Sequence, residues 1–287
     1  MQDGENQRSP AFLLRFPRYW GLGGQGLSIH SFYTAMTFTS PSRASVTVML
    51  DYAALCDLAA GRIAALVQEK PNAVLGLATG STPLGVYERL VQRYQRGELD
   101  FSQVTCFNLD EYYPVLPASP HSYHAFMHQH LFQHINCRRW SVPDGSAGTA
   151  EQIAHRCRDY EVKIKDAGGV DLQLLGIGRT GHIGFNEPGS PPDSRTRLVT
   201  LDPLTREDAA AGFGGLNLVP RQAVSLGLGT ILEAWEIVVL ASGPAKAEIV
   251  RRAVEEEASA AVPASWLRLH PNVRLYLDRS AASRLTK

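Results

Sequence analysis

Short apolar runs rich in β-branched residues alternate with longer segments of helical period from residue 44 onward. In the first unit, residues 45–50 read as a buried strand, and the apolar residues of 55–67 then fall on one helical face. The runs 172–177 and 237–241 are almost continuously apolar, as is typical of parallel strands buried on both faces. Further strands are predicted at 73–78 and 104–108, and further helices at 83–94, 122–132, 150–167 and 245–257.

This alternation predicts an α/β domain with a mainly parallel sheet and right-handed crossover connections. Ligands of such sheets bind beyond the carboxyl ends of the strands. No low-complexity linker or internal repeat interrupts 44–287, so we expect a single catalytic domain there. Residues 1–43 show no sustained period, and we expect them to form a poorly ordered leader.

Charge and cysteine content bear on which partners the protein can bind and in which cell compartment it works. The 28 basic and 28 acidic residues balance, so the field of the whole chain gives no support for binding nucleic acid or a membrane. No apolar run approaches the roughly 20 residues that cross a bilayer. The four cysteines are widely spaced and form no CxxC pair, so we interpret them as reduced thiols of a cytoplasmic protein.

The segment Thr-Gly-Ser-Thr-Pro at 79–83 follows one predicted strand and opens the next predicted helix. Gly80 permits a tight turn there. The hydroxyls of Thr79, Ser81 and Thr82, with the free amides of a helix start, would form an anion site suited to phosphate. The alternative is an ordinary helix start with Thr82 as its cap. No lysine follows in the register of the nucleotide-binding P-loop, which argues against ATP.

Two adjacent carboxylates, Asp110 and Glu111, follow the predicted strand 104–108. Neighbouring side chains at a strand end point in different directions, so one can face the cleft as a base while the structure holds the other. We interpret Asp110 as the base. The alternative is a helix cap or an ion pair within a loop.

The segment 176–188 places Gly176, Gly178 and Gly181 together with His182 and Glu187 in one short excursion from the end of a predicted strand. A histidine beside a carboxylate is a pair that can transfer protons near neutral pH. A structural histidine is the alternative, but it leaves the shared occurrence of the glycine-rich turn and the Asn-Glu-Pro triplet unexplained. The glycine spacing is also similar to a dinucleotide fingerprint, which belongs after the first strand of a fold.

Several cations lie in or near later loops, namely Arg195, Arg197, Arg206 and Lys246. Such residues can complete a phosphate site as charged donors. Exposed arginines and lysines more often serve solubility, and this alternative stays open for each of the four.

Seven segments together resemble the glucosamine-6-phosphate deaminase (isomerase) family, and the resemblance covers residues 44 to about 277. They are LGLATGSTPLGVY, FNLDEYYP, SYHAFMHQHLF, GHIGFNEPGS, SRTRLVTL, AVSLGLGTIL and GPAKAEIV. The resemblance implies a three-layer α/β/α domain related to Rossmann folds. It also implies conversion of glucosamine 6-phosphate to fructose 6-phosphate and ammonia in amino-sugar catabolism, without a metal or an organic cofactor.

The resemblance further implies roles for individual residues. Asp110 matches the base that moves a proton between C2 and C1, His182 the histidine that assists ring opening, and Glu187 the glutamate that supports it. The positions matching those that hold the substrate phosphate are Thr79, Gly80, Ser81, Thr82 and Lys246. Tyr123 matches a tyrosine near the active-site lid.

One departure from the family pattern lies beside the histidine. The family typically has an aspartate directly before the Gly-His pair, and this chain has Thr180. A threonine oxygen can orient the imidazole through a hydrogen bond, but it cannot supply a negative charge. Either His182 lacks that charge or another carboxylate supplies it, and Glu111 is one candidate.

A second departure concerns phosphate binding. The arginine that binds phosphate from the lid of family members falls at Ala211. Lys246 and the loop 79–82 would then bind the phosphate, with help from Arg206.

A third difference concerns regulation. In allosteric members an acetylamino-sugar phosphate binds near the segment that matches 190–199. Ser190 and Arg197 are retained here, but Pro191 and Val199 replace a serine and a lysine. The resemblance therefore implies a vestigial allosteric site, with weak or absent activation by N-acetylglucosamine 6-phosphate.

Two other functions stay open as alternatives. A 6-phosphogluconolactonase has a similar sheet and phosphate loop, but its pattern after the glycine-rich turn usually lacks Phe-Asn-Glu-Pro. A non-catalytic sugar-phosphate sensor would reuse the fold as an effector domain, although the sequence shows no DNA-binding segment. The sequence also leaves open whether the chain forms a homo-oligomer.

Overall fold

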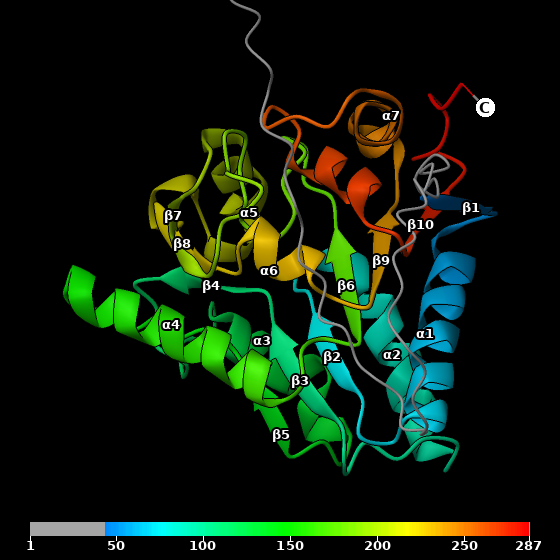
Figure 1. Cartoon of the computed structure of the whole chain (residues 1–287), viewed down its shortest axis with the longest axis horizontal. Coiled ribbons are helices and arrows are strands. Elements are labelled where there is room, and N and C mark those ends of the chain that lie inside the picture. The colour runs from blue at the N-terminus through cyan, green and yellow to red at the C-terminus, as the bar shows by residue number, and fades with distance from the viewer. Residues whose placement is uncertain (1–43, 287) are drawn as a thin grey trace, which may run out of the picture. The chain divides into compact units, whose positions relative to one another are not determined.

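A seven-stranded sheet, in which all neighbouring strands run parallel, forms the centre of the fold (Figure 1). The computed structural model describes residues 44–286. The strand order is β1-β10-β9-β6-β2-β3-β5, and it reverses between β2 and β6. The strands are β1 (Ser45–Met49), β2 (Val74–Leu77), β3 (Thr105–Asn108), β5 (Arg139–Ser141), β6 (Leu172–Gly176), β9 (Glu236–Ala241) and β10 (Val273–Asp278). The predicted mainly parallel sheet is confirmed.

Helices cover both faces of this sheet and complete the predicted three layers. They are α1 (Tyr52–Glu69), α2 (Ser81–Gln95), α3 (Tyr123–His130), α4 (Ala150–Asp166), α5 (Pro203–Phe213), α6 (Leu228–Leu232) and α7 (Ala247–Glu255). Short 3-10 helices lie at η1 (Phe132–His134), η2 (Leu216–Leu218), η3 (Pro244–Lys246) and η4 (Pro263–Leu269). Leu174 packs with α1, α2 and α3, whereas the next residue, Leu175, packs with α4, α6 and α7. This alternation explains why the central strands are apolar without interruption.

A second, smaller sheet lies apart from the first, and the sequence did not predict it. Its strands are β4 (Asp110–Tyr113), β7 (Arg197–Thr200) and β8 (Gln222–Ser225), arranged antiparallel in the order β4-β8-β7. Leu109 alone separates β4 from β3. Asp110 therefore lies at the point where the chain leaves the parallel sheet and enters the antiparallel one.

The prediction of a poorly ordered leader at 1–43 lies outside the described residues. Residues 44–286 belong to one compact unit. None of the helices in that range is long and apolar enough to cross a membrane. The four cysteines are buried and free of disulfides.

Glu111 fixes the start of α3 against β4. Its carboxylate accepts backbone N–H groups from Tyr112 at 2.9 Å, Tyr123 at 2.8 Å and His124 at 3.0 Å. The last two are free amides in the first turn of α3, where a negative charge is favourable. Burial raises the pKa of Glu111 to about 7, although the three hydrogen bonds oppose that rise.

We expect Glu111→Gln to lower the free energy of unfolding by about 1–3 kcal/mol at pH 8.5, where the carboxylate is ionised. The amide nitrogen of glutamine would face a backbone N–H, so one buried donor would lose its acceptor. Urea unfolding followed by circular dichroism measures this change. As a control, Glu233→Gln removes an exposed carboxylate that pairs with Arg195, and the unfolding midpoint should stay where it is. Equal midpoints for both variants would contradict this role of Glu111.

Candidate active site

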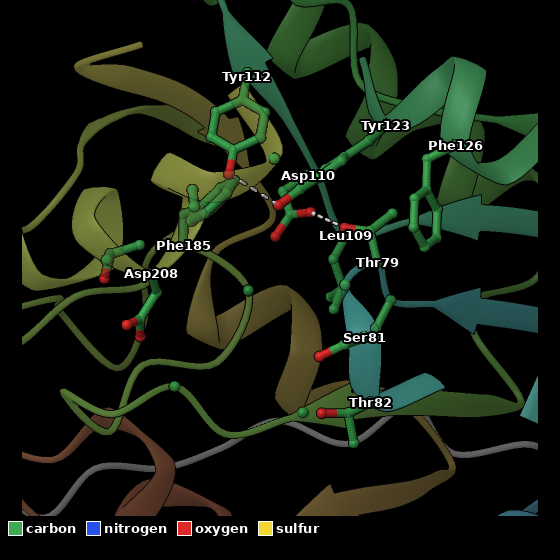
Figure 2. Close-up of a pocket in the computed structure, with 18 of the residues that line it drawn as sticks. Thr79, Ser81, Thr82, Leu109, Asp110, Tyr112, Tyr123, Phe126, Phe185 and Asp208 are labelled. Atoms are coloured by element: carbon green, nitrogen blue, oxygen red, sulfur yellow. Dashed lines mark hydrogen bonds between the residues drawn. The ribbon is translucent and has the colours of Figure 1, made fainter. Parts of the chain in front are cut away.

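A cavity of about 500 Å³ opens at the carboxyl ends of four adjacent strands, β9, β6, β2 and β3 (Figure 2). The loop after β2 contributes residues 78–83, and the segment after β6 contributes Gly178 and His182. Asp110 enters from the start of β4, and Lys246 enters from the loop after β9. The helix α5 closes another side. The prediction that a ligand site lies beyond the strand ends agrees with this position.

One end of the cavity has groups that suit an anion. The helix α2 begins at Ser81, and its N-cap Gly80, with φ of 102°, provides no side-chain hydrogen bond to the helix. The alternative in which Thr82 caps the helix is therefore wrong, because Thr82 lies inside the first turn. The free amides of that turn and the hydroxyls of Ser81 and Thr82 are at the cavity wall (Figure 2).

Lys246 lines the same cavity and forms no ion pair with a described residue. Burial lowers the pKa of its ammonium group, with Asp208 acting to raise the pKa and Arg179 to lower it. A half-buried cation without a bonded partner favours an anionic ligand. Thr79, Gly80, Ser81, Thr82 and Lys246, which the resemblance assigned to the phosphate, thus line one cavity.

Asp110 is 5% exposed, and no cation of the described chain pairs with its carboxylate. Thr79 Oγ1 donates a hydrogen bond to Asp110 Oδ1 at 3.5 Å. Burial raises the pKa of Asp110 to about 8, and the neighbouring charge of Glu111 adds to the rise, whereas the hydroxyl of Thr79 lowers it. A carboxylate with a pKa in this range is basic enough to remove a proton from carbon.

His182 is held through one nitrogen only. Its Nδ1 lies 2.9 Å from Thr180 Oγ1, 3.1 Å from Thr205 Oγ1 and 3.2 Å from Glu187 Oε2. The imidazole lies close against Gly178, where an added Cβ would lie 2.1 Å from both Cε1 and Nε2. No described residue bonds to Nε2, and the ring lines the cavity, so Nε2 is available to a ligand.

Glu187 is the carboxylate that accompanies His182. Burial acts to raise its pKa, but hydrogen bonds from His182, Thr205 and Thr180 outweigh that effect and hold the pKa below the ordinary value. Its other oxygen accepts the backbone N–H of Asp202 at 3.3 Å. Glu187 is therefore ionised and adjacent to the imidazole, so it can stabilise a positive charge there.

The candidate role of Glu111 as a substitute partner for His182 is wrong, because both of its oxygens are bonded to the backbone of β4 and α3. Thr180 does contact His182, and its hydroxyl also donates to Glu187 Oε2 at 2.9 Å. The negative charge near the histidine thus comes from Glu187 itself, and Thr180 connects the two.

Aromatic rings form a wall of the cavity. Tyr123 stacks on Phe185 with ring centroids 5.9 Å apart, and its hydroxyl lies 3.3 Å from that of Tyr112 (Figure 2). Phe213 from α5 packs edge-on against Tyr112. These rings would exclude water from a bound ligand, so that fewer water molecules compete for the hydrogen bonds of the ligand's hydroxyls.

Three of the predicted cations lie away from the cavity. The guanidinium of Arg206 donates to the carbonyls of Leu216, Val219 and Pro220 and so fixes η2, which means that the expected help from Arg206 in binding phosphate is wrong. Arg195 pairs with Glu233 on the surface. The third, Arg197, contacts Ser190.

Ser190 and Arg197 contact each other outside the cavity. Arg197 donates to Ser190 Oγ at 3.1 Å and to Asn186 Oδ1 at 2.9 Å. Burial lowers the pKa of Arg197. Ser190 and Arg197, which the resemblance assigned to a vestigial allosteric site, therefore form one small polar cluster with Asn186.

The sequence patterns did not mark several of the cavity residues, among them Tyr112, Phe185, Thr205 and Asp208. Tyr112 and Phe185 sit within segments already singled out, so a search for aromatic residues beside the acid-base groups would have found them. Thr205 and Asp208 reach the site only because α5 folds back onto it, and no local signal marks them.

A sequence model of the family described as glucosamine-6-phosphate isomerases/6-phosphogluconolactonase matches residues 51–276. A glucosamine-6-phosphate deaminase of Thermoanaerobacter pseudethanolicus is 46% identical over 238 residues, which are 83% of this chain and 94% of that protein. Glucosamine-6-phosphate deaminase 2 of Bacillus subtilis is 49% identical over 238 residues, with 82% and 94% covered.

Solved structures give the same grouping. A monomeric glucosamine-6-phosphate deaminase is 44% identical with a TM-score of 0.81, covering 84% of this chain and 99% of that one. The 6-phosphogluconolactonase of Trypanosoma cruzi has a TM-score of 0.70 at 20% identity, over 87% of this chain and 100% of that one, and so shares the fold. The chain belongs to the family of glucosamine-6-phosphate isomerases and 6-phosphogluconolactonases.

Proposed function

We propose that the protein is a glucosamine-6-phosphate deaminase, which converts glucosamine 6-phosphate and water to fructose 6-phosphate and ammonia. One observation carries the proposal: a single cavity is lined by an anion-binding end, a buried carboxylate of raised pKa and a separate histidine that Glu187 contacts through Nδ1. Relatives that are 46–49% identical over about four fifths of the chain have that name. The buried free cysteines fit an enzyme of the reducing cytoplasm.

The phosphate would bind at the start of α2 and to Lys246. Ser81, Thr82 and the free amides of the first turn donate hydrogen bonds, and Lys246 supplies the positive charge. This end of the cavity fixes the sugar without taking part in the bond changes. The aromatic wall would then cover the sugar and keep bulk water out.

His182 would open the sugar ring. Its Nε2 takes the proton from the C1 hydroxyl and delivers it to the ring oxygen as the bond between C1 and that oxygen breaks. The imidazole is positively charged between these steps, and Glu187 stabilises that charge through Nδ1. Thr180 and Thr205 hold the ring in the orientation that points Nε2 at the cavity.

Asp110 would carry the proton between the carbons. In the open aldehyde the C2–H bond breaks, its electrons form the C1–C2 double bond, and O1 takes up a proton, which gives an enolamine. Protonation at C1 then produces an iminium group at C2. Water adds to C2, the carbon–nitrogen bond breaks, and ammonia leaves. Proton transfer at the sugar oxygens and proton transfer at C1 and C2 need two separate groups, here His182 and Asp110. A general base of this kind contributes roughly 10²–10⁴-fold to the rate.

The direct test incubates the purified protein with glucosamine 6-phosphate and measures both ammonia and fructose 6-phosphate. Equal amounts of the two products are expected. Binding of the sugar phosphate without either product would contradict the proposal and favour a sensor. Hydrolysis of 6-phosphogluconolactone in place of deamination would favour a lactonase.

We expect Asp110→Asn to abolish exchange of the C2 proton with solvent while leaving phosphate binding largely intact. An amide cannot accept the proton, whereas the phosphate end of the cavity is formed by other residues. Deuterium incorporation from D₂O, followed by proton NMR, measures the exchange.

The matched control for this experiment is Asp57→Asn, which removes an exposed carboxylate that pairs with Arg89. Exchange in the control should match the wild type. Exchange retained in Asp110→Asn would remove Asp110 from the role of base.

We also expect N-acetylglucosamine 6-phosphate to cause little or no activation. Ser190 and Arg197 are in contact, but Pro191 and Val199 offer no hydroxyl or ammonium group to complete a site for the effector. Initial rates at a fixed low substrate concentration, with and without the effector, measure this. A several-fold change in substrate affinity would contradict the prediction.

A further inference from the structure

The cavity has little positive charge to attract a ligand that carries a phosphate dianion. Lys246 is the single lysine or arginine among the described residues that line it. Asp208 from α5 lines it too, and its carboxylate would repel the phosphate. Figure 2 shows Asp208 across the cavity from Ser81 and Thr82. One cation beside one carboxylate leaves little net attraction for a dianion.

A second cation lies directly behind Asp208. Arg179 Nε donates to Asp208 Oδ2 at 2.9 Å, and Arg179 Nη2 donates to Asp208 Oδ1, so the pair is bidentate. Arg179 follows Gly178, which lines the cavity, and its charge acts on Lys246 by lowering the pKa of that residue. The guanidinium thus pairs with a carboxylate of the cavity wall, although it does not line the cavity itself.

We propose that Arg179 is a second phosphate-binding residue, which exchanges Asp208 for the substrate phosphate. A phosphate offers the planar guanidinium the same two-oxygen acceptor as a carboxylate, with more negative charge. In the absence of ligand, Asp208 occupies the guanidinium and neutralises it. The proposal rests on the proposed function only in taking the ligand to be a sugar phosphate.

The exchange is energetically accessible because the pair is exposed. The side chains of Arg179 and Asp208 are 38% and 40% exposed, and ion pairs at such positions contribute little to stability. Asp208 can turn back into water when it leaves Arg179, so no buried charge is left without a partner. A contact to a phosphate that is partly enclosed by the cavity would be stronger than the one it replaces.

The same exchange would connect phosphate binding to the histidine. Asp208 and Thr205 both belong to α5, and Thr205 contacts His182 Nδ1 at 3.1 Å. Release of Asp208 removes one bond that ties α5 to the segment that holds His182. A phosphate in the cavity therefore changes how the helix beside the acid-base pair is held.

The test measures binding of inorganic phosphate and of fructose 6-phosphate by isothermal titration calorimetry, so it does not depend on activity. We expect Arg179→Gln to weaken both affinities by about tenfold or more, because it removes a charged bidentate contact. Arg179→Lys keeps the positive charge but cannot form the bidentate contact, so its affinities should fall less than those of Arg179→Gln. Asp208→Asn should strengthen binding several-fold, and that gain should shrink when Arg179 is also replaced.

Arg96→Gln is the matched control, because Arg96 also forms an exposed bidentate pair, with Glu98 at 2.5 and 3.3 Å, at the opposite end of α2. Its affinities should equal those of the wild type. Unchanged affinities in Arg179→Gln would overturn the proposal. So would weaker binding in Asp208→Asn, because the pair would then be a structural support. A wild-type protein that binds phosphate through Arg179 but releases no ammonia would contradict the proposed function alone.

Discussion

The buried carboxylate of Asp110 is the constraint on which the rest of the site depends. A carboxylate that is 5% exposed and lacks a paired cation is costly to ionise, and this cost is what raises its pKa to about 8. Asp110 lies at the junction of two sheets, where the backbone of β4 pairs with β8. This pairing fixes the backbone at Asp110 and keeps its side chain buried. The fold thereby produces a base that is much stronger than an exposed aspartate.

The site also requires that His182 and Asp110 stay apart. Two glycines, Gly178 and Gly184, contribute to this separation. Gly178 lets the imidazole of His182 approach the backbone closely, and any side chain there would collide with the ring. Gly184 turns the chain with φ of 55°, and a Cβ there would lie 3.1 Å from the hydroxyl of Ser225. The glycine-rich segment thus directs Nδ1 to Glu187 and leaves Nε2 for the ligand, while Asp110 stays free of both.

Local patterns predicted the parallel sheet and most of its helices because the central strands are apolar on both faces and the helices on one. They also placed Asp110, His182 and the loop 79–82 at one edge, since the carboxyl ends of neighbouring parallel strands meet there. The antiparallel sheet escaped prediction because β4 has the polar sequence Asp-Glu-Tyr-Tyr and its partner β8 lies more than 100 residues later. The role of Glu111 was misjudged because its hydrogen-bond donors are backbone N–H groups of α3, which no side-chain pattern reveals.

The most direct test of the account is the titration of Asp110 itself, followed by NMR of protein labelled with carbon-13 at the aspartate carboxyl groups. Comparison with Asp110→Asn identifies the signal. A midpoint near pH 8 is expected, and a still higher one in Thr79→Val, because that variant removes the hydrogen bond that favours the ionised form. A midpoint near pH 4, the ordinary value for an aspartate, would contradict the account.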